Sequence, residues 1–174
     1  AYVLNRSNKF EQSLQQAEIL LQANPGNLSF KNLKAVALSK IGDYENAIKL
    51  YDDVLAENPG YSKIWHSFGH TLKTAGLLER AIAVYRKSIE LEPAYGEAYW
   101  SLANLKTFRF TDQDVEQMRR QLESEQLTEE ERFHFDFALG KAMEDRKDYR
   151  QAFQSYEKGS RWRRKPIDYS PERN

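Results

Sequence analysis

Landmark residues of this chain recur at a spacing of 34 residues. Pro25, Pro59 and Pro93 are separated by this interval, and so are Gly42 and Gly76. The same interval relates two further pairs: Ala47 with Ala81, and Tyr51 with Tyr85. A fixed period of this length indicates a chain that stacks one small structural unit several times.

The pattern within each unit is that of helices. Ile48, Tyr51 and Leu55 follow the i, i+3, i+7 spacing of one helix face, and no strand-like alternation competes with it. Gly42 or Gly76 falls between two such stretches, where a turn requires it, and a proline follows the second stretch. Each unit is therefore predicted to hold two antiparallel helices, and the chain to be all-α.

The residue types at the repeated positions have packing reasons. Ala47 and Ala81 are small where two helices approach closely, while Tyr51 and Tyr85 fill the wider gap to the next unit. The set "W..FG..L...G....A...Y.......P" over residues 65 to 93 resembles the tetratricopeptide repeat. The resemblance implies a right-handed superhelix of antiparallel helix pairs.

Other parts of the chain match this repeat less closely. In residues 28 to 61, Lys31 and Lys34 stand where Trp65 and Phe68 stand one repeat later. Residues 1 to 27 resemble a repeat whose first helix has been cut short. The pattern returns in "LGKAMEDRKDYRQAFQSYEKG", residues 139 to 159.

Between the two regular regions, the register changes. Ala152 lies 71 residues after Ala81, which is two periods plus three residues. Residues 107 to 127 are therefore expected to occupy the place of one second helix and its turn. Thr111 with Asp114 predicts the start of a helix there, and Thr128 with Glu131 predicts a capping box for the next one.

A narrower resemblance covers residues 96 to about 165. The runs "GEAYWSLANLKTFRFTDQDVEQMRRQL" and "LTEEERFHFDFALGKAMEDRKDYRQAFQSYEKGSRWRR" resemble the region that joins tetratricopeptide repeats to a sulfotransferase domain in bacterial proteins. The chain departs from that pattern at Lys147, where glycine is common. The resemblance implies that a sulfotransferase domain, using 3'-phosphoadenosine-5'-phosphosulfate, follows Asn174.

The expected organisation follows from these patterns. Residues 1–95 are predicted to be a repeat array with a truncated first repeat, and residues 96–127 a divergent repeat with an inserted helix. Residues 128–165 are predicted to be a C-terminal helix pair, and residues 166–174 a linker toward a downstream domain. The linker prediction rests on Pro166 and Pro171 in "KPIDYSPERN".

Composition narrows the functional classes. Lys plus Arg (26) equals Asp plus Glu (26), so no global field favours nucleic acid or an anionic membrane. The chain has no cysteine, which fits a reducing, cytoplasmic compartment, and no apolar run approaches the ~20 residues of a membrane span. It also lacks a Gly-rich phosphate loop after a strand, so this fragment is expected to bind no cofactor and not to be an enzyme.

The first helix of each pair lines the inner face of a tetratricopeptide superhelix, which is where a ligand is expected. Polar residues beside an aromatic one suit an extended peptide. The alternative is that they are ordinary groove-wall residues. The predicted peptide-binding residues are Asn32, Val36, His66, His70, Lys73, Trp100 and Asn104.

The most direct function is an interaction scaffold for a protein or peptide, at the N-terminal side of a sulfotransferase. The alternative is a free-standing adaptor, or a module that forms a homodimer when an apolar end at residues 1 to 4 pairs with another copy. His66 and His70 are spaced for zinc, but "HSFGH" lacks the glutamate of a zinc protease motif, so no metal is expected. The basic run "RWRRK", residues 161 to 165, is read as a favourable helix end.

Overall fold

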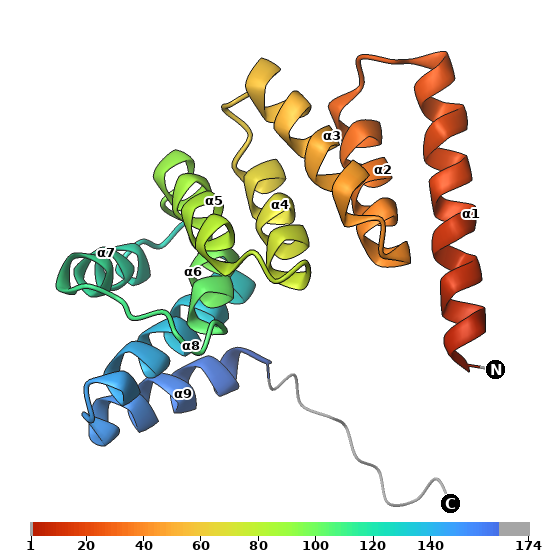
Figure 1. Ribbon diagram of the computed structural model, residues 1–174. Helices are drawn as coiled ribbons and strands as arrows, with labels where there is room; N and C mark the ends of the chain where they lie inside the picture. The colour runs from red at the N-terminus through yellow and green to blue at the C-terminus, as the bar shows by residue number, and fades with distance from the viewer. Residues whose placement is uncertain (1, 164–174) are drawn as a thin grey trace, which may run out of the picture. The chain divides into compact units, whose positions relative to one another are not determined.

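The computed structural model describes the backbone of residues 2–163 and the side chains of residues 9–162. In this part of the chain all regular structure is helical, which confirms the all-α prediction (Figure 1). The chain divides into two compact units, Ala1–Leu91 and Glu92–Asn174, and each is described by itself.

The first unit is a row of antiparallel helices in which each contacts the next (Figure 1). α2 pairs with α3, α4 pairs with α5, and α1 packs against α2 as a single helix. Their bounds are α1 Tyr2–Ala23, α2 Leu28–Ile41, α3 Tyr44–Glu57, α4 Ser62–Thr74 and α5 Leu78–Leu91.

The glycines and prolines that recur in the sequence lie at the ends of these helices. Gly42, after α2, and Gly76, after α4, have φ values of 92° and 81°, a left-handed conformation that glycine adopts without steric cost. Pro59 and Pro93 lie just past the ends of α3 and α5, where a proline can no longer interrupt helical hydrogen bonds. Both roles were predicted from the repeat spacing and are confirmed.

The repeated alanines and tyrosines form the core of the first unit. Ala47 and Ala81 are completely buried, as predicted for close helix contact. Tyr51 reaches the next pair, where its ring stacks on Phe68 with centroids 5.0 Å apart. Tyr85 lies against the first helix of its own pair, where a Cβ at Gly69 would be 2.6 Å from its Cδ1 atom. The prediction that the tyrosines fill the gap to the next unit is confirmed for Tyr51, and for Tyr85 it stays a prediction.

The second unit contains four described helices, of which α8 and α9 form an antiparallel pair. Thr111 and Thr128 each accept a hydrogen bond from the backbone N–H three residues later, completing the capping boxes with Asp114 and Glu131. Both predicted helix starts are confirmed. The bounds are α6 Gly96–Ala103, α7 Asp112–Leu122, α8 Glu129–Asp145 and α9 Tyr149–Arg163.

The inserted helix α7 does not take the place of a second helix in a pair. The short helix α6 packs against α8, and α7 also packs against α8 rather than pairing with α6. The α6–α8 approach depends on Gly96, since a Cβ there would lie 2.8 Å from the carbonyl oxygen of Glu131. The rings of Tyr99 and Phe135 are 5.0 Å apart in the same contact. The expectation for residues 107 to 127 was wrong because this long-range packing overrides the repeat spacing.

The turn between α8 and α9 differs from the equivalent turns of the first unit. Lys147 has a φ of 63°, in the left-handed region that Gly42 and Gly76 also occupy. The sequence had singled out Lys147 as a departure from glycine. The fold therefore holds an L-residue at a position whose backbone suits glycine.

None of the helices within residues 2–163 combines the length and apolarity needed to cross a membrane.

Candidate functional site

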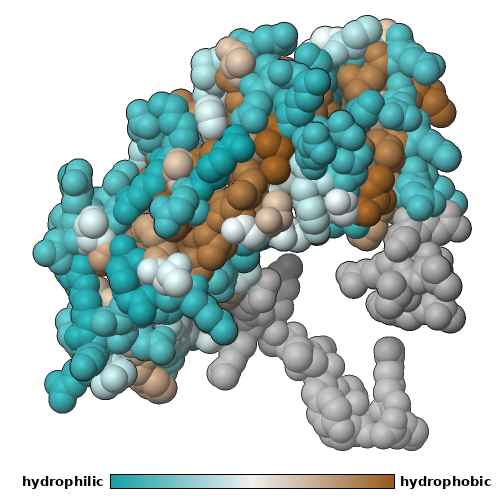
Figure 2. Space-filling model, viewed as in Figure 1, coloured by the Kyte–Doolittle hydropathy of each residue, from teal (hydrophilic) through white to brown (hydrophobic). Residues whose placement is uncertain are grey.

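A hollow of about 270 Å³ lies between α2 and α4, the first helices of two successive pairs in the first unit. Its wall combines the apolar side chain of Val36 with hydroxyl groups, one lysine and one imidazole. On the surface in Figure 2, apolar and polar side chains likewise alternate over the first unit. The lining residues are Val36, Ser39, Lys40, Ser67, His70, Thr71 and Thr74.

Three hydroxyl groups of the hollow donate their protons to their own helix. Ser67 Oγ donates to the carbonyl oxygen of Lys63 at 3.0 Å, and Thr74 Oγ1 donates to that of His70 at 2.8 Å. Thr71 Oγ1 lies 3.5 Å from the carbonyl oxygen of Ser67. Each hydroxyl oxygen keeps lone pairs after its proton is used, but Thr71 is only 2% exposed, so Ser67 and Thr74 are the residues that present acceptors to the hollow.

Two predicted groove residues are held by the tyrosines of the second helices. The Tyr51 hydroxyl donates to Asn32 Oδ1 at 3.2 Å, and the Tyr85 hydroxyl is hydrogen-bonded to His70 Nδ1 at 3.1 Å. Burial raises the pKa of Tyr51, with smaller opposing effects of Thr71 and Ser67, so its hydroxyl keeps its proton at neutral pH. Tyrosines of α3 and α5 thus fix the positions of Asn32 on α2 and His70 on α4.

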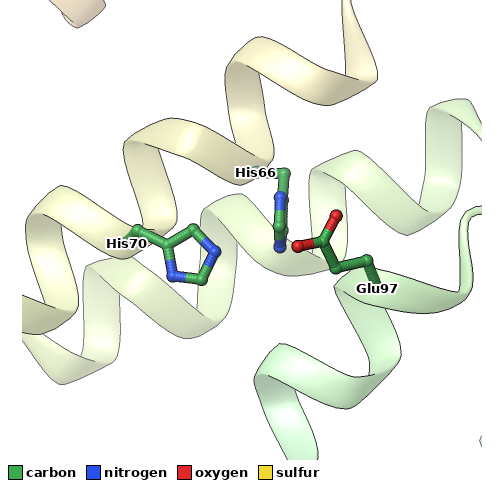
Figure 3. A group of neighbouring side chains, drawn as sticks. All are labelled: His66, His70 and Glu97. Carbon is green, nitrogen blue, oxygen red and sulfur yellow. The ribbon is translucent and has the colours of Figure 1, made fainter. Parts of the chain in front are cut away.

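The two histidines of α4 lie on successive turns of that helix (Figure 3). Their ring centroids are 4.4 Å apart and the rings meet edge to face. His66 is buried, whereas His70 is exposed at the hollow. A structural zinc site needs about four ligands, and the described residues of the first unit alone bring no third metal-binding side chain to this pair. Glu97, also drawn in Figure 3, belongs to α6 of the second unit.

The remaining predicted residues have different surroundings. Lys73 is half-buried in the last turn of α4. Trp100, in the second unit, has its ring 5.3 Å from that of His134 and 6.3 Å from that of Phe133, so α8 already engages part of it. Asn104 donates through Nδ2 to the carbonyl oxygen of Trp100 at 2.9 Å.

The structure therefore brings Val36 and His70 together at one hollow. It adds residues that the sequence prediction had not proposed as ligands, among them Lys40, Ser67, Thr71 and Thr74. A signal was available, because Ser67, Thr71 and Thr74 lie three or four residues from His70 or from each other. The predicted stripe was one residue wide, whereas a hollow between two helices exposes a broader arc of each.

The other predicted sites lie near the two ends of the chain. In the basic run, Arg161 forms an ion pair with Glu157 at 2.9 Å, and Trp162 Nε1 donates to Asp136 Oδ2 at 3.1 Å. The side chains of residues 163 to 165, like the apolar end at residues 1 to 4, lie outside the described side chains.

These helix pairs, with glycine turns and an Ala–Tyr packing register, define a tetratricopeptide-repeat protein. Residues 2–121 match the family described as "Psidin, N-terminal TPR repeats region", and the chain belongs to this family. No curated protein matches the sequence.

Solved structures share the fold. A crystal structure of MamA is similar to this chain with a TM-score of 0.62 and 16% identity over 90% of both chains. The structure titled "MamA 41-end from Desulfovibrio magneticus RS-1" has a TM-score of 0.61 and 20% identity over 94% of both chains. BtubC (BKLC) from P. vanneervenii has a TM-score of 0.57 and 14% identity, covering 100% of this chain and 96% of that one. At these identities the likeness extends to the fold, which confirms the predicted class.

Proposed function

We propose that this chain is a non-catalytic interaction scaffold that holds an extended peptide segment of a partner protein between α2 and α4. The observation that carries the proposal is the hollow between these first helices, where Val36 offers an apolar contact beside hydroxyl acceptors and His70. Repeat solenoids present such surfaces as extended binding faces. An extended peptide has the matching chemistry, since its free backbone N–H groups are donors.

The size and lining of the hollow favour a peptide over a small-molecule ligand. Sites for small molecules usually measure about 300 to 1,000 Å³ and are mainly apolar. This hollow is about 270 Å³ and most of its lining residues are polar. A side chain of a peptide can enter it while the peptide backbone runs across α2 and α4.

The test begins with a display library of random twelve-residue peptides, selected on the purified chain. Selected peptides are then titrated by calorimetry against wild type, Val36→Arg and Ala83→Arg. Val36→Arg places an arginine in the hollow, whereas Ala83→Arg places one on the exposed side of α5, so the two variants introduce the same residue in different places. We expect Val36→Arg to weaken binding by at least about 10-fold, as loss of a central contact does, and Ala83→Arg by less than about 2-fold.

Equal losses in the two variants would place the binding surface elsewhere and overturn the proposal. A selection that yields no peptide sensitive to Val36→Arg would overturn it as well. Thermal melts of both variants exclude unfolding as the cause.

A link to sulfotransfer rests on the sequence resemblance of residues 96 to about 165. We propose on that basis that the chain is the repeat region of a bacterial sulfotransferase in the cytoplasm. The donor 3'-phosphoadenosine-5'-phosphosulfate would then bind a separate domain, because the described residues contain no strand–loop–helix phosphate site. The coding sequence after Asn174 tests this proposal, since it must encode a strand followed by a Gly-rich loop.

Self-association is the second candidate, and it has one supporting observation. On α1, the neighbouring apolar residues Ile19 and Leu20 are 64% and 38% exposed. A second copy could cover them and form a homodimer through the repeat ends. Sedimentation equilibrium of wild type and Ile19→Glu tests this: a monomer at all concentrations contradicts it.

A further inference from the structure

The last described helix, α9, exposes two aromatic side chains on one of its sides. Tyr149 and Phe153 are 66% and 69% exposed, the highest values among the large apolar side chains of the described residues. They are four residues apart, so both rings lie on the same side of the helix. Aromatic rings that are held together in water mark a surface suited to contact with another molecule.

The repeat register shows how the fold uses the corresponding side of another second helix. Tyr156 of α9 is equivalent to Tyr51 of α3, since each follows the buried alanine of its helix by four residues. Tyr51 is buried, and its ring stacks on Phe68 of the following helix, α4. Tyr156 is only half-buried, and Phe153 lies one turn before it. This side of α9 therefore has the register of a surface that receives another helix.

The helix α8 covers a different side of α9 and leaves the aromatic side open. Gly159 is buried against α8, where a Cβ would lie 2.5 Å from the Cδ2 atom of Phe137. Arg150, Gln154 and Glu157 are exposed, as the two aromatic rings are. Another helix can therefore reach the aromatic side of α9 without displacing α8.

Two charges of opposite sign flank the aromatic rings. Arg150 precedes Phe153 by three residues and Glu157 follows it by four, so both lie one turn from its ring. Arg150 forms no ion pair with any other described residue. Glu157 pairs with Arg161 of its own helix at 2.9 Å, but both side chains are well exposed, so this pair is weak. Glu157 is therefore available to a second cation.

We infer that α9 packs antiparallel against α9 of a second copy of this chain, with the two Phe153 rings at the centre. Arg150 and Glu157 stand on opposite sides of Phe153, at about 4.5 Å and 6 Å along the helix axis. A twofold rotation therefore brings Arg150 of each copy opposite Glu157 of the other. Each copy supplies the same surface, which makes the interface isologous and closes the assembly as a dimer.

This dimer is separate from the sites considered above. It does not depend on the hollow between α2 and α4, so it goes beyond the scaffold function. It also uses a different surface from the α1 end, where Ile19 and Leu20 are exposed. Variants of α9 and of α1 can therefore distinguish the two modes of self-association.

The mixed charge favours a second copy over a polyanion. Exposed aromatic rings beside an arginine can stack on the bases of single-stranded nucleic acid. Glu157, however, lies one turn from Phe153 on the same side of α9 and would repel a phosphate backbone. A second copy satisfies both Arg150 and Glu157, whereas nucleic acid satisfies only one of them.

The interface is small, so the dimer should form reversibly. A Tyr or Phe side chain buries about 150 to 250 Å² when it is covered completely. Tyr149 and Phe153 are about two-thirds exposed, so the four rings of a dimer would bury about 400 to 650 Å². The flanking residues bring the total toward the lower end of specific interfaces, about 1,200 Å². We therefore expect a dissociation constant in the micromolar range.

The experiment is sedimentation equilibrium of the purified full chain over a wide range of concentrations. Phe153→Glu places a charge at the centre of the interface and should raise the dissociation constant of the dimer by at least about 10-fold. Tyr61→Glu is the matched control, because it makes the same kind of change at another aromatic residue, which is 53% exposed in the first unit. It should change the constant by less than about 2-fold.

Charge reversal tests the antiparallel register. Arg150→Glu and Glu157→Arg each place like charges opposite one another, so each variant alone should dimerise at least about 5-fold more weakly than wild type. A mixture of the two variants should form a heterodimer about as tight as the wild-type dimer, because both pairs again join opposite charges. Arg120→Glu, an exposed reversal on α7, mixed with Glu157→Arg has the same net charges. This control mixture should remain weaker, since one like-charge pair persists.

Each result decides for or against the α9 dimer. A wild-type chain that stays monomeric up to about 1 mM would overturn the inference. A dimer that survives Phe153→Glu would overturn it as well, and loss of that dimer in Ile19→Glu would assign the interface to α1. Equal losses in Phe153→Glu and Tyr61→Glu would show that added charge alone acts.

The mixtures give the last decision. A mixture of Arg150→Glu with Glu157→Arg that dimerises no better than the control mixture would overturn the antiparallel pairing. Thermal melts of every variant exclude unfolding as the cause, which is a fair expectation because all the substituted side chains are exposed.

Discussion

The pairs α4–α5 and α8–α9 follow the same internal register but differ in surface chemistry. In both, a glycine of the first helix lies under a tyrosine ring of the second: Gly69 under Tyr85, and Gly140 under Tyr156. The first helices are nevertheless opposite in charge, since α4 has no acidic residue while α8 contains six. The packing positions are fixed by helix contact, whereas the remaining positions are free to set what each pair binds.

The two tyrosines also differ in how firmly they are held. Tyr85 is completely buried and its hydroxyl meets His70, whereas Tyr156 is half-buried and its hydroxyl donates to exposed Glu144 at 2.8 Å. Equivalent substitutions in the two pairs should therefore have unequal effects. Hydrogen exchange on peptides from each pair can separate those effects within one chain.

The largest expected difference comes from removing the tyrosine rings. Tyr85→Ala should destabilise α4–α5 by about 4 kcal/mol, because it leaves a large cavity in a closed core. Tyr156→Ala should destabilise α8–α9 by about 2 kcal/mol, because solvent reaches part of the space. The measurement is urea unfolding combined with hydrogen exchange. Equal losses would mean that the difference in burial does not govern stability.

A smaller difference is expected when the glycines gain a methyl group. A Cβ at either Gly69 or Gly140 would lie 2.6 Å from a tyrosine Cδ1 atom, so a ring must move. Tyr85 has no space to move, and Gly69→Ala should cost a net ~2 kcal/mol after the gain in helix propensity. Tyr156 can shift toward solvent, and Gly140→Ala should be close to neutral. Thermal unfolding of both variants checks this, and a larger loss at Gly140 would contradict it.

Local features of the fold were predictable from the sequence. The 34-residue landmarks, the capping boxes at Thr111 and Thr128, and the glycine turns depend on residues within a few positions of each other. The packing of α6 on α8 could not be predicted this way. It depends on Gly96 meeting Glu131, 35 positions later, and no repeat spacing encodes that contact.

The candidate site was also predictable in part, where it depends on residues close together on one helix. The stripe through Val36 and His70 follows from helix periodicity, and both residues line the hollow. Ser67 and Thr74 lie three and four residues from His70, so helix periodicity places them on its side, but that they share a hollow with α2 depends on how α2 and α4 approach each other. Lys40 was not predicted, although it follows Val36 by four residues and helix periodicity places the two on one side of α2.

The turns of the two helix pairs allow matched substitutions in opposite directions. Lys147 has a φ of 63° where the turn after α4 has Gly76 at 81°. Lys147→Gly should stabilise the chain by about 1 kcal/mol, because the left-handed conformation strains an L-residue, and Gly76→Lys should destabilise it by about the same amount. Urea midpoints of both variants provide the measurement. Lys147→Ala is the control and should gain nothing, since alanine has the same steric penalty.

The smallest expected effect is a pH dependence confined to the second pair. Asp136, on α8, is 5% exposed, and burial raises the pKa of its carboxyl group, although Trp162, Lys158 and Arg132 oppose the shift. A raised folded-state pKa means that the fold binds this proton more tightly than the unfolded chain does. The stabilisation of the fold by the protonated Asp136 carboxyl group is thus fully present below the unfolded pKa of about 3.9. It is lost as pH rises through the folded-state pKa.

Asp136→Asn should therefore gain stability relative to wild type at pH 7 and lose that advantage as pH falls toward 4. The amide oxygen can still accept the hydrogen bond that Trp162 Nε1 donates at 3.1 Å, so packing is retained. The equivalent position in α4 is Trp65, whose Nε1 donates to the carbonyl oxygen of Pro59 at 2.8 Å and which does not ionise. Trp65→Phe should accordingly change stability by the same amount at every pH. Urea unfolding at pH 4, 5, 6 and 7 measures both, and a pH-independent offset for Asp136→Asn would mean that the charged carboxylate is not penalised by its burial between α8 and α9.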